Sequence, residues 1–288
     1  MPYILLSVVI AVNLSRTFCM RKISFACANL KHTLWANVWI NLFAAIFSLA
    51  VALCQGALVF TDKVTLLTAL LCAACLFICN LASMFAYRLG TVALTDVSTN
   101  ASLLISCAAG WIFFRDNFML VSLFAVFVLV VGMTLMTLDR KYTGGLSAAL
   151  LLACALTFAG NGVLMIGQRL FTYYPSAGNI GSFNFFMFGF TVLFSLAMLP
   201  FGGKAEPFPF KKTVLPIVGE SGGLTAVACL MTYLSGQLPA AILYPISCGL
   251  TIALNYILSR TAYREKGGVR GLIGIVLVIA SLVALNLF

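Results

Sequence analysis

The sequence predicts an all-α integral membrane protein with ten transmembrane helices, arranged as two inverted five-helix repeats. Three observations predict this fold class. Hydrophobic residues make up 62% of the 288 residues and charged residues only 8%, whereas a soluble domain is about half apolar and about a quarter charged. Uncharged runs of about 18 residues or more, the length that crosses a bilayer, recur along the whole chain. The chain also resembles itself when it is shifted by 148 or 149 residues.

Each uncharged apolar run long enough to cross a bilayer is interpreted as one helix, and longer runs are divided at turn residues. The run 221–259, for example, is too long for one span and is divided at Gly236-Gln237-Leu238-Pro239. No segment alternates at period two, as the strands of a membrane barrel do. The predicted helices cover residues 2–20, 33–53, 64–88, 91–114, 118–138, 146–170, 179–199, 213–235, 239–259 and 269–288.

The internal repeat divides the chain into residues 1–140 and 141–288, with five predicted helices in each unit. Residues of like chemistry recur at the shift: Arg115-Asp116 with Arg264-Glu265, Asn13 with Asn161, and Arg21 with Arg169. Because five is an odd number of spans, the second unit enters the membrane in the opposite sense to the first. Inverted repeats of this kind are the architecture of many secondary transporters.

A polar stripe follows the fourth predicted helix, and a second stripe follows the ninth. The stripes are Thr95, Thr99, Ser102 and Ser106, and, 149 residues later, Tyr244, Cys248, Thr251 and Asn255. The spacing i, i+4, i+7, i+11 places each set on one helix face. Lipid offers hydroxyl and amide groups no partner, so these faces should meet protein or water. We expect the two stripes to line one polar cavity.

Two acidic residues, Asp96 and Glu220, lie one to two turns inside predicted helices without a basic neighbour. A charge at this depth costs about 2.5–3.5 kcal/mol on insertion scales, so each needs a partner or access to water. Removal from water favours the protonated form of a carboxyl group, which makes both residues candidates for proton coupling. Asp96 could instead complement the dipole of its helix N-terminus. Glu220 could instead pair with Lys211 or Lys212.

Two asparagines inside predicted helices, Asn13 and Asn161, are further candidates for binding a solute. A membrane asparagine can also simply bond a neighbouring helix. The sequence Gly160-Asn161-Gly162 fits either a local break in the helix or a close helix crossing, and the close crossing is favoured. The predicted solute-binding residues are therefore Thr95, Thr99, Ser102, Ser106, Tyr244, Thr251, Asn255, Asn13 and Asn161.

Catalytic motifs are missing from the sequence. His32, the single histidine, falls in a predicted loop with no carboxylate nearby, and there is no HExxH pair, P-loop or GxSxG elbow. Cys72, Cys75 and Cys79 share a helix face and could bind a soft metal, but small core residues are the favoured interpretation. The sequence thus predicts no enzyme, no cofactor and no metal site.

The net charge of +10 belongs to helix ends rather than to a nucleic-acid site. Most of the 17 Lys and Arg residues fall in or beside the loops after the odd-numbered predicted helices. The positive-inside rule places these loops in the cytoplasm and both termini outside. The expected surroundings are a lipid bilayer, and nucleic acid is not expected as a partner.

Three motifs carry a family resemblance: Trp111-Ile112-Phe113-Phe114-Arg115-Asp116, Tyr244-Pro245-Ile246-Ser247 and Tyr263-Arg264-Glu265-Lys266. In this pattern the chain resembles the EamA-type repeat of the drug/metabolite transporter superfamily. The resemblance implies ten helices, a central substrate cavity lined by the fourth and ninth helices among others, and usually both termini inside. The chain departs from the family in the loop between its second and third helices, where only Asp62-Lys63 is charged.

These observations together lead to one functional expectation and one alternative. We expect a secondary transporter that moves a small organic metabolite or drug-like solute by alternating access, with proton coupling as an option, in the plasma or inner membrane. The alternative is a non-transporting membrane scaffold or sensor whose polar stripes only hold helices together. The sequence leaves open whether the protein is a homodimer.

Overall fold

The computed structural model describes residues 2–56, 63–89, 92–114, 120–138, 147–173, 179–203, 207–262 and 269–287. Every regular element in these ranges is a helix. In order they are α1 (Pro2–Ala26), α2 (Leu30–Cys54), α3 (Lys63–Leu89), α4 (Val92–Ala101), α5 (Leu103–Phe114), α6 (Leu120–Leu138), α7 (Ala148–Tyr173), α8 (Ile180–Met198), the short 3-10 helix η1 (Leu199–Gly202), α9 (Phe210–Ser235), α10 (Ala240–Ala262) and α11 (Val269–Leu287). The predicted all-α class is confirmed.

Six of the described helices are long and apolar enough to cross a membrane, judged by length and composition. They cover Pro2–Ala26, Leu30–Cys54, Lys63–Arg88, Ala148–Tyr173, Ile180–Gly202 and Phe210–Ser235. Large apolar side chains also point outward; Leu67 is 65% exposed, Phe127 64% and Leu152 61%. A bilayer would cover such side chains, whereas water would penalise them. These features indicate a multi-pass membrane protein.

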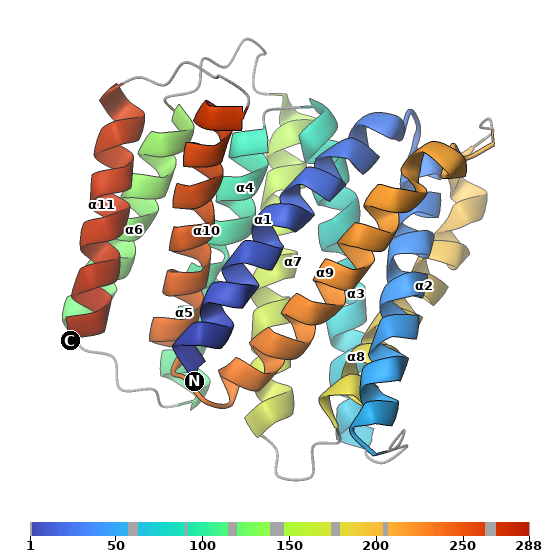
Figure 1. Ribbon diagram of the computed structural model, residues 1–288, viewed down its shortest axis with the longest axis horizontal. Coiled ribbons are helices and arrows are strands. Elements are labelled where there is room, and N and C mark those ends of the chain that lie inside the picture. The colour runs from blue at the N-terminus through green and yellow to red at the C-terminus, as the bar shows by residue number, and fades with distance from the viewer. Residues whose placement is uncertain are drawn as a thin grey trace.

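The helices of the two halves of the sequence pack between one another (Figure 1). Helix α1 packs on α9, α3 on α7, α2 on α8, and α6 on α11, while α4 and α5 both contact α10. Helix α1 begins and α11 ends at the same end of the bundle. The bundle therefore consists of interleaved halves, and most of its large helix contacts join one half to the other.

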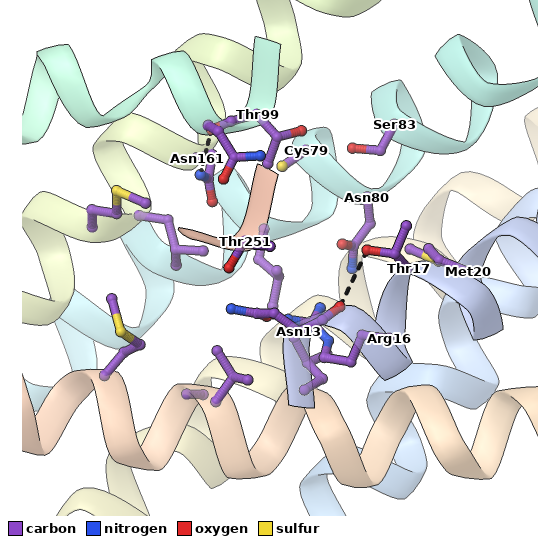
Figure 2. A pocket seen from close by; sticks show the side chains of 18 of the residues that line it. Asn13, Arg16, Thr17, Met20, Cys79, Asn80, Ser83, Thr99, Asn161 and Thr251 are labelled. Carbon is purple, nitrogen blue, oxygen red and sulfur yellow. Dashed lines mark hydrogen bonds between the residues drawn. The ribbon is translucent and has the colours of Figure 1, made fainter. Parts of the chain in front are cut away.

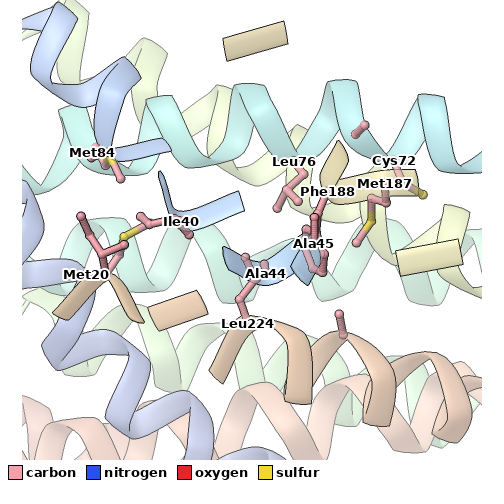
Figure 3. Close-up of a cluster of buried hydrophobic side chains, with 14 of the residues drawn as sticks. Met20, Ile40, Ala44, Ala45, Cys72, Leu76, Met84, Met187, Phe188 and Leu224 are labelled. Carbon is pink, nitrogen blue, oxygen red and sulfur yellow. The ribbon is translucent and has the colours of Figure 1, made fainter. Parts of the chain in front are cut away.

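Two large apolar clusters hold the bundle together. One lies among α1, α2, α3, α8 and α9 and includes Met20, Ile40, Leu76, Phe188 and Leu224 (Figure 3). The other joins α1, α5, α6, α9 and α10 and includes Leu6, Leu103, Leu129, Met231 and Cys248. Met20, Leu76 and Leu224 of the first cluster and Met231 and Cys248 of the second also line one cavity. The cavity therefore lies between the two clusters.

Helix α7 is continuous through Gly160-Asn161-Gly162, and both glycines lie at close helix crossings. A Cβ at Gly160 would lie 3.1 Å from the carbonyl oxygen of Cys75, and a Cβ at Gly162 would lie 2.7 Å from the side chain of Ile105. The close-crossing interpretation fits this geometry, and a broken helix does not. Small residues let two membrane helices approach closely. Gly160 allows this approach between α7 and α3, and Gly162 allows it between α7 and α5.

The predicted helix 91–114 is wrong as a single element, because it is divided at Ser102 into α4 and α5. The hydroxyl of Ser102 donates to the carbonyl oxygen of Thr99, and Asn161 Nδ2 of α7 donates to the same oxygen at 3.0 Å. A carbonyl oxygen has two lone pairs. These two donors therefore compete with the Leu103 N–H that an unbroken helix would bring to Thr99.

Two further sequence expectations change in the structure. His32, predicted in a loop, lies in the first turn of α2 because that helix begins at Leu30. Its ring is buried and packs edge-on against Phe208, with centroids 6.0 Å apart. The side chain of Asp96 lies outside the described part of the chain, as do residues 62, 115–116 and 263–266.

Candidate functional site

A cavity of about 210 Å³ lies inside the bundle, between the two halves of the sequence (Figure 2). Its walls come from α1, α3 and α4 of the first half and from α7, α8, α9 and α10 of the second. Pockets for drug-sized ligands measure about 300–1,000 Å³. A cavity of this size therefore suits a solute smaller than a typical drug.

An ion pair between Arg16 of α1 and Glu220 of α9 forms part of the cavity wall. Glu220 Oε1 accepts from Arg16 Nε at 3.0 Å and from Arg16 Nη2 at 2.8 Å, and Arg16 Nη1 donates to Asn13 Oδ1 at 3.1 Å. The side chain of Glu220 is 1% exposed and that of Arg16 is 21% exposed. Glu220 Oε2 is buried with no hydrogen-bond partner among the described residues. The carboxylate therefore keeps one oxygen unsatisfied.

Glycine next to Glu220 lets α1 and α9 come close enough for this pair. A Cβ at Gly223 would lie 2.6 Å from Cγ of Arg16, and a Cβ at Gly219 would lie 3.1 Å from Sγ of Cys19. The aliphatic stem of Arg16 thus lies directly on the backbone of α9 at Gly223. One turn earlier on that helix, Glu220 receives the guanidinium group.

Six of the predicted site residues line the cavity: Asn13, Thr99, Asn161, Glu220, Thr251 and Asn255. Four others do not line it: Thr95, Ser102, Ser106 and Tyr244. These four side chains are buried against protein, with exposures of 0–2%. Tyr244, for example, donates through its hydroxyl to the carbonyl oxygen of Met165 at 3.1 Å. The stripes of the fourth and ninth helices therefore face the cavity only in part.

Asn161 connects α7 to the division between α4 and α5. Its Nδ2 donates to the carbonyl oxygen of Thr99 at 3.0 Å and to Ser102 Oγ at 2.7 Å (Figure 2 shows the first of these). Ser102 therefore fixes a cavity residue without lining the cavity itself.

A second polar network runs from the cavity into the first apolar cluster. Asn80 of α3 lines the cavity and donates from Nδ2 to Asn37 Oδ1 of α2 at 3.0 Å. Asn41 Nδ2 donates to the same oxygen at 2.7 Å, and Asn37 Nδ2 donates to Ser195 Oγ of α8 at 3.0 Å. Buried polar groups that are bonded in this way fix the relative positions of their helices. The network joins α2, α3 and α8 behind the cavity wall.

Sequence reasoning missed Arg16, Asn80 and Gln168, all of which line the cavity. The sequence interpretation assigned the basic residues in general to helix ends, although Arg16 is the one charged residue inside the predicted helix 2–20. A charged residue inside an apolar predicted helix was the signal that could have identified Arg16 as a site residue. The suggested pairing of Glu220 with Lys211 or Lys212 is wrong, because Glu220 pairs with Arg16 and both lysines are exposed.

Comparison with known proteins supports the fold. No protein-family model and no curated protein sequence matches the chain. Among solved structures, 28 chains match it. One of these, described only as the crystal structure of a protein, is 13% identical and superposes with a TM-score of 0.69 over 98% of this chain and 97% of its own. At this identity the likeness concerns the fold alone.

Proposed function

We propose that the protein is a secondary transporter that moves a small organic solute across a membrane by alternating access. The observation that carries the proposal is a cavity with a partly polar lining, formed by both halves of an apolar helix bundle, that contains the Arg16–Glu220 ion pair. Ionisable residues inside membrane helices are expensive and mark substrate or ion pathways. Secondary transporters place their substrate site between two repeats in this manner.

We further propose ten membrane spans in two inverted five-helix repeats, related to the EamA-type transporters. The proposed correspondence is α1 with α7, α2 with α8, α3 with α9, α4 and α5 with α10, and α6 with α11. Under this exchange the contact of α1 with α9 becomes that of α7 with α3, and the α2–α8 and α6–α11 contacts map onto themselves. A pseudo-two-fold axis would produce this exchange. Asn13 and Asn161, 148 residues apart, also line the same cavity.

In the proposed cycle, the two halves rock around the cavity and open it to one side of the membrane at a time. Asn13, Thr99, Asn161, Thr251 and Asn255 supply hydrogen bonds to the solute. Glu220 is the proposed coupling residue; a proton that binds its free oxygen Oε2 neutralises the carboxylate and so weakens its attraction for the guanidinium group of Arg16. Protonation would therefore loosen the contact between α1 and α9. Asp96 remains the second candidate for coupling.

The proposal is tested by transport into proteoliposomes that contain the purified protein. A panel of labelled metabolites is offered with and without an imposed pH gradient, and protein-free vesicles are the control. Saturable uptake or counterflow of at least one solute is expected. Binding without movement of any bound solute, in either direction and under any gradient, would contradict the proposal.

The second candidate is a non-transporting membrane scaffold or sensor, and one observation favours it. Thr95, Ser102, Ser106 and Tyr244 are buried away from the cavity. Much of the polar stripe thus serves to join helices, as the scaffold interpretation requires. The cavity and its ion pair favour transport, because helix adhesion alone does not need a charged pair at a cavity wall.

A further inference from the structure

The hydrogen bonds around Asn161 determine which end of its amide faces the cavity. The carbonyl oxygen of Thr99 can only accept, so Nδ2 of Asn161 must point toward it. The hydroxyl of Ser102 donates to the same carbonyl and therefore accepts from Asn161 Nδ2. Both N–H groups of Asn161 are used in these bonds. Its Oδ1 remains as a hydrogen-bond acceptor for the cavity that Asn161 lines.

The same argument determines the orientation of Asn80. Ser195 Oγ donates to the carbonyl oxygen of Thr191 at 2.7 Å, so it accepts from Asn37 Nδ2. Asn37 therefore turns its Oδ1 toward Asn80, which donates to it from Nδ2. The amide of Asn80 is held from behind by its N–H group. Its Oδ1 is thus a second acceptor available to the cavity (Figure 2).

The charge of the cavity is balanced without any solute. Among the described residues that line it, the charged ones are Arg16 and Glu220, and they pair with each other. Arg16 makes three hydrogen bonds through its guanidinium group, which carries five N–H donors. Two N–H donors of Arg16 and the buried oxygen Oε2 of Glu220 are therefore left over. A solute with a net charge would find no counter-charge here.

We propose that the cavity binds a small solute that is electrically neutral overall and carries an N–H donor at one end and an oxygen acceptor at the other. The donor would meet Asn80 Oδ1 or Asn161 Oδ1, and the acceptor would meet the remaining N–H groups of Arg16. A zwitterion and an uncharged amide share this chemistry. The inference rests on the proposed function, because it names the solute class of the same cavity.

The test uses four compounds with one branched apolar chain: leucine, isocaproamide, isoamylamine and isocaproate. Their chain suits the apolar part of the wall, which includes Leu76, Leu164 and Leu224. Binding to the purified protein is measured by calorimetry and by thermal stabilisation at neutral pH. Leucine or isocaproamide should bind, and isoamylamine and isocaproate should bind about tenfold more weakly or worse, since each brings an unpaired charge. Tighter binding of leucine would indicate a zwitterionic solute, and tighter binding of isocaproamide would indicate an uncharged amide.

Charge variants give a second test that does not depend on the affinity of the native protein. Glu220→Gln leaves Arg16 unpaired and should move the preference toward isocaproate. Arg16→Gln leaves Glu220 unpaired and should move it toward isoamylamine. The double variant Arg16→Gln/Glu220→Gln restores neutrality and should again prefer the neutral compounds. If either single variant fails to fold, the other and the double variant still carry the comparison.

The acceptor role is tested with two buried asparagines. Asn80→Ala removes an acceptor from the cavity and should weaken the binding of isocaproamide. Asn184→Ala, at a buried position on α8 that does not line the cavity, is the matched control and should leave this binding unchanged. Thermal unfolding of both variants shows whether an effect on binding reflects a loss of folded protein.

The inference is overturned if isoamylamine or isocaproate binds the native protein most tightly. It is also overturned if none of the four binds, or if the charge variants leave the order of preference unchanged. Failure of the proposed function is a different result. Binding of a neutral compound that is never transported would defeat the transporter proposal and leave this inference standing, and transport of a charged solute would do the reverse.

Discussion

The Arg16–Glu220 pair costs free energy to place inside an apolar bundle, because both groups lose water. Pairing recovers much of this cost, but apolar residues in the same place would often be at least as stable. The carboxylate also keeps Oε2 without a partner, which is a further penalty for a buried acceptor. A pair of this kind is therefore easier to explain by function than by stability.

Removing one member of the pair should be more harmful than removing both. Arg16→Gln or Glu220→Gln alone leaves a charge unpaired inside the bundle, which costs about 3–5 kcal/mol for fully buried pairs. The cost here should be smaller, because the side chain of Arg16 is 21% exposed. The double variant Arg16→Gln/Glu220→Gln leaves no charge and should unfold at a higher temperature than either single variant. Thermal unfolding of the purified proteins measures the difference. Losses of the two single variants that simply add up in the double variant would show that the pair is not energetically coupled.

Proton coupling is expected to depend on Glu220. Glu220→Gln keeps the shape of the side chain and removes its titration, so it should abolish proton-driven accumulation while exchange of bound solute continues. The measurement is uptake and counterflow in proteoliposomes across a range of external pH. Asp96→Asn is the comparison variant. Unchanged pH dependence in Glu220→Gln together with its loss in Asp96→Asn would identify Asp96 as the coupling residue.

Helix α7 connects the two halves of the bundle because it carries a small residue on either side of the polar side chain of Asn161. Gly160 contacts α3, Gly162 contacts α5, and Asn161 between them bonds to Thr99 and Ser102. In a membrane, such close contacts replace the hydrophobic driving force that lipid removes. The same three residues thus set both the packing of α7 and the orientation of one cavity amide.

The close crossing at Gly162 predicts a clear difference between two glycine substitutions. Gly162→Ala would place a methyl group 2.7–3.0 Å from three atoms of the Ile105 side chain, and overpacking of this kind costs about 1–3 kcal/mol. Gly189→Ala on α8 meets no atom within 4 Å and should be neutral or stabilising by up to about 1 kcal/mol, since alanine favours a helix. Thermal unfolding of both variants tests this. A Gly162→Ala protein as stable as Gly189→Ala would show that α7 does not need the close approach.

Helices were predictable from sequence here, whereas the contacts between them were not. Long apolar runs depend only on local composition, and the predicted all-α membrane class is confirmed by the helices observed. The division at Ser102 depends on a bond from Asn161, which is 59 residues away in sequence. The partner of Glu220 is Arg16, 204 residues away. No local sequence pattern identifies contacts between residues so far apart, although a lone arginine inside an apolar run indicates that it needs a partner.

The cavity is lined by helices of both halves of the sequence, so a movement of one half against the other would change access to it. The proposed transport cycle requires such a change in access, and chemical labelling can detect it. Thr251 lines the cavity, whereas Ser102 is buried behind it. These two positions correspond to each other in the internal repeat, which makes them a matched pair for labelling.

Cysteine at position 251 should react with a small water-soluble thiol reagent, and cysteine at position 102 should not. The background protein must lack the ten native cysteines, because Cys79 and Cys248 also line the cavity. Labelling is measured in proteoliposomes, with and without solute, and solute should slow the reaction at position 251. Equal reactivity at both positions, or no reaction at 251 under any condition, would contradict the cavity as described.

The orientation of the whole bundle gives the last prediction. Helix α1 begins and α11 ends at the same end of the bundle, so both termini should lie on the same side of the membrane. Most Lys and Arg residues fall at the loops after the first, third, fifth, seventh and ninth predicted helices, and cytoplasmic loops retain such charges during insertion. A reporter fused after Phe288 should therefore register the outer side, and one fused before Met1 should do the same.

Cytoplasmic signals from both fusions would instead support the orientation usual for EamA-type transporters, with the basic residues acting as anchors at helix ends. Signals from opposite sides would mean an odd number of spans, which ten helices in two five-helix repeats do not allow.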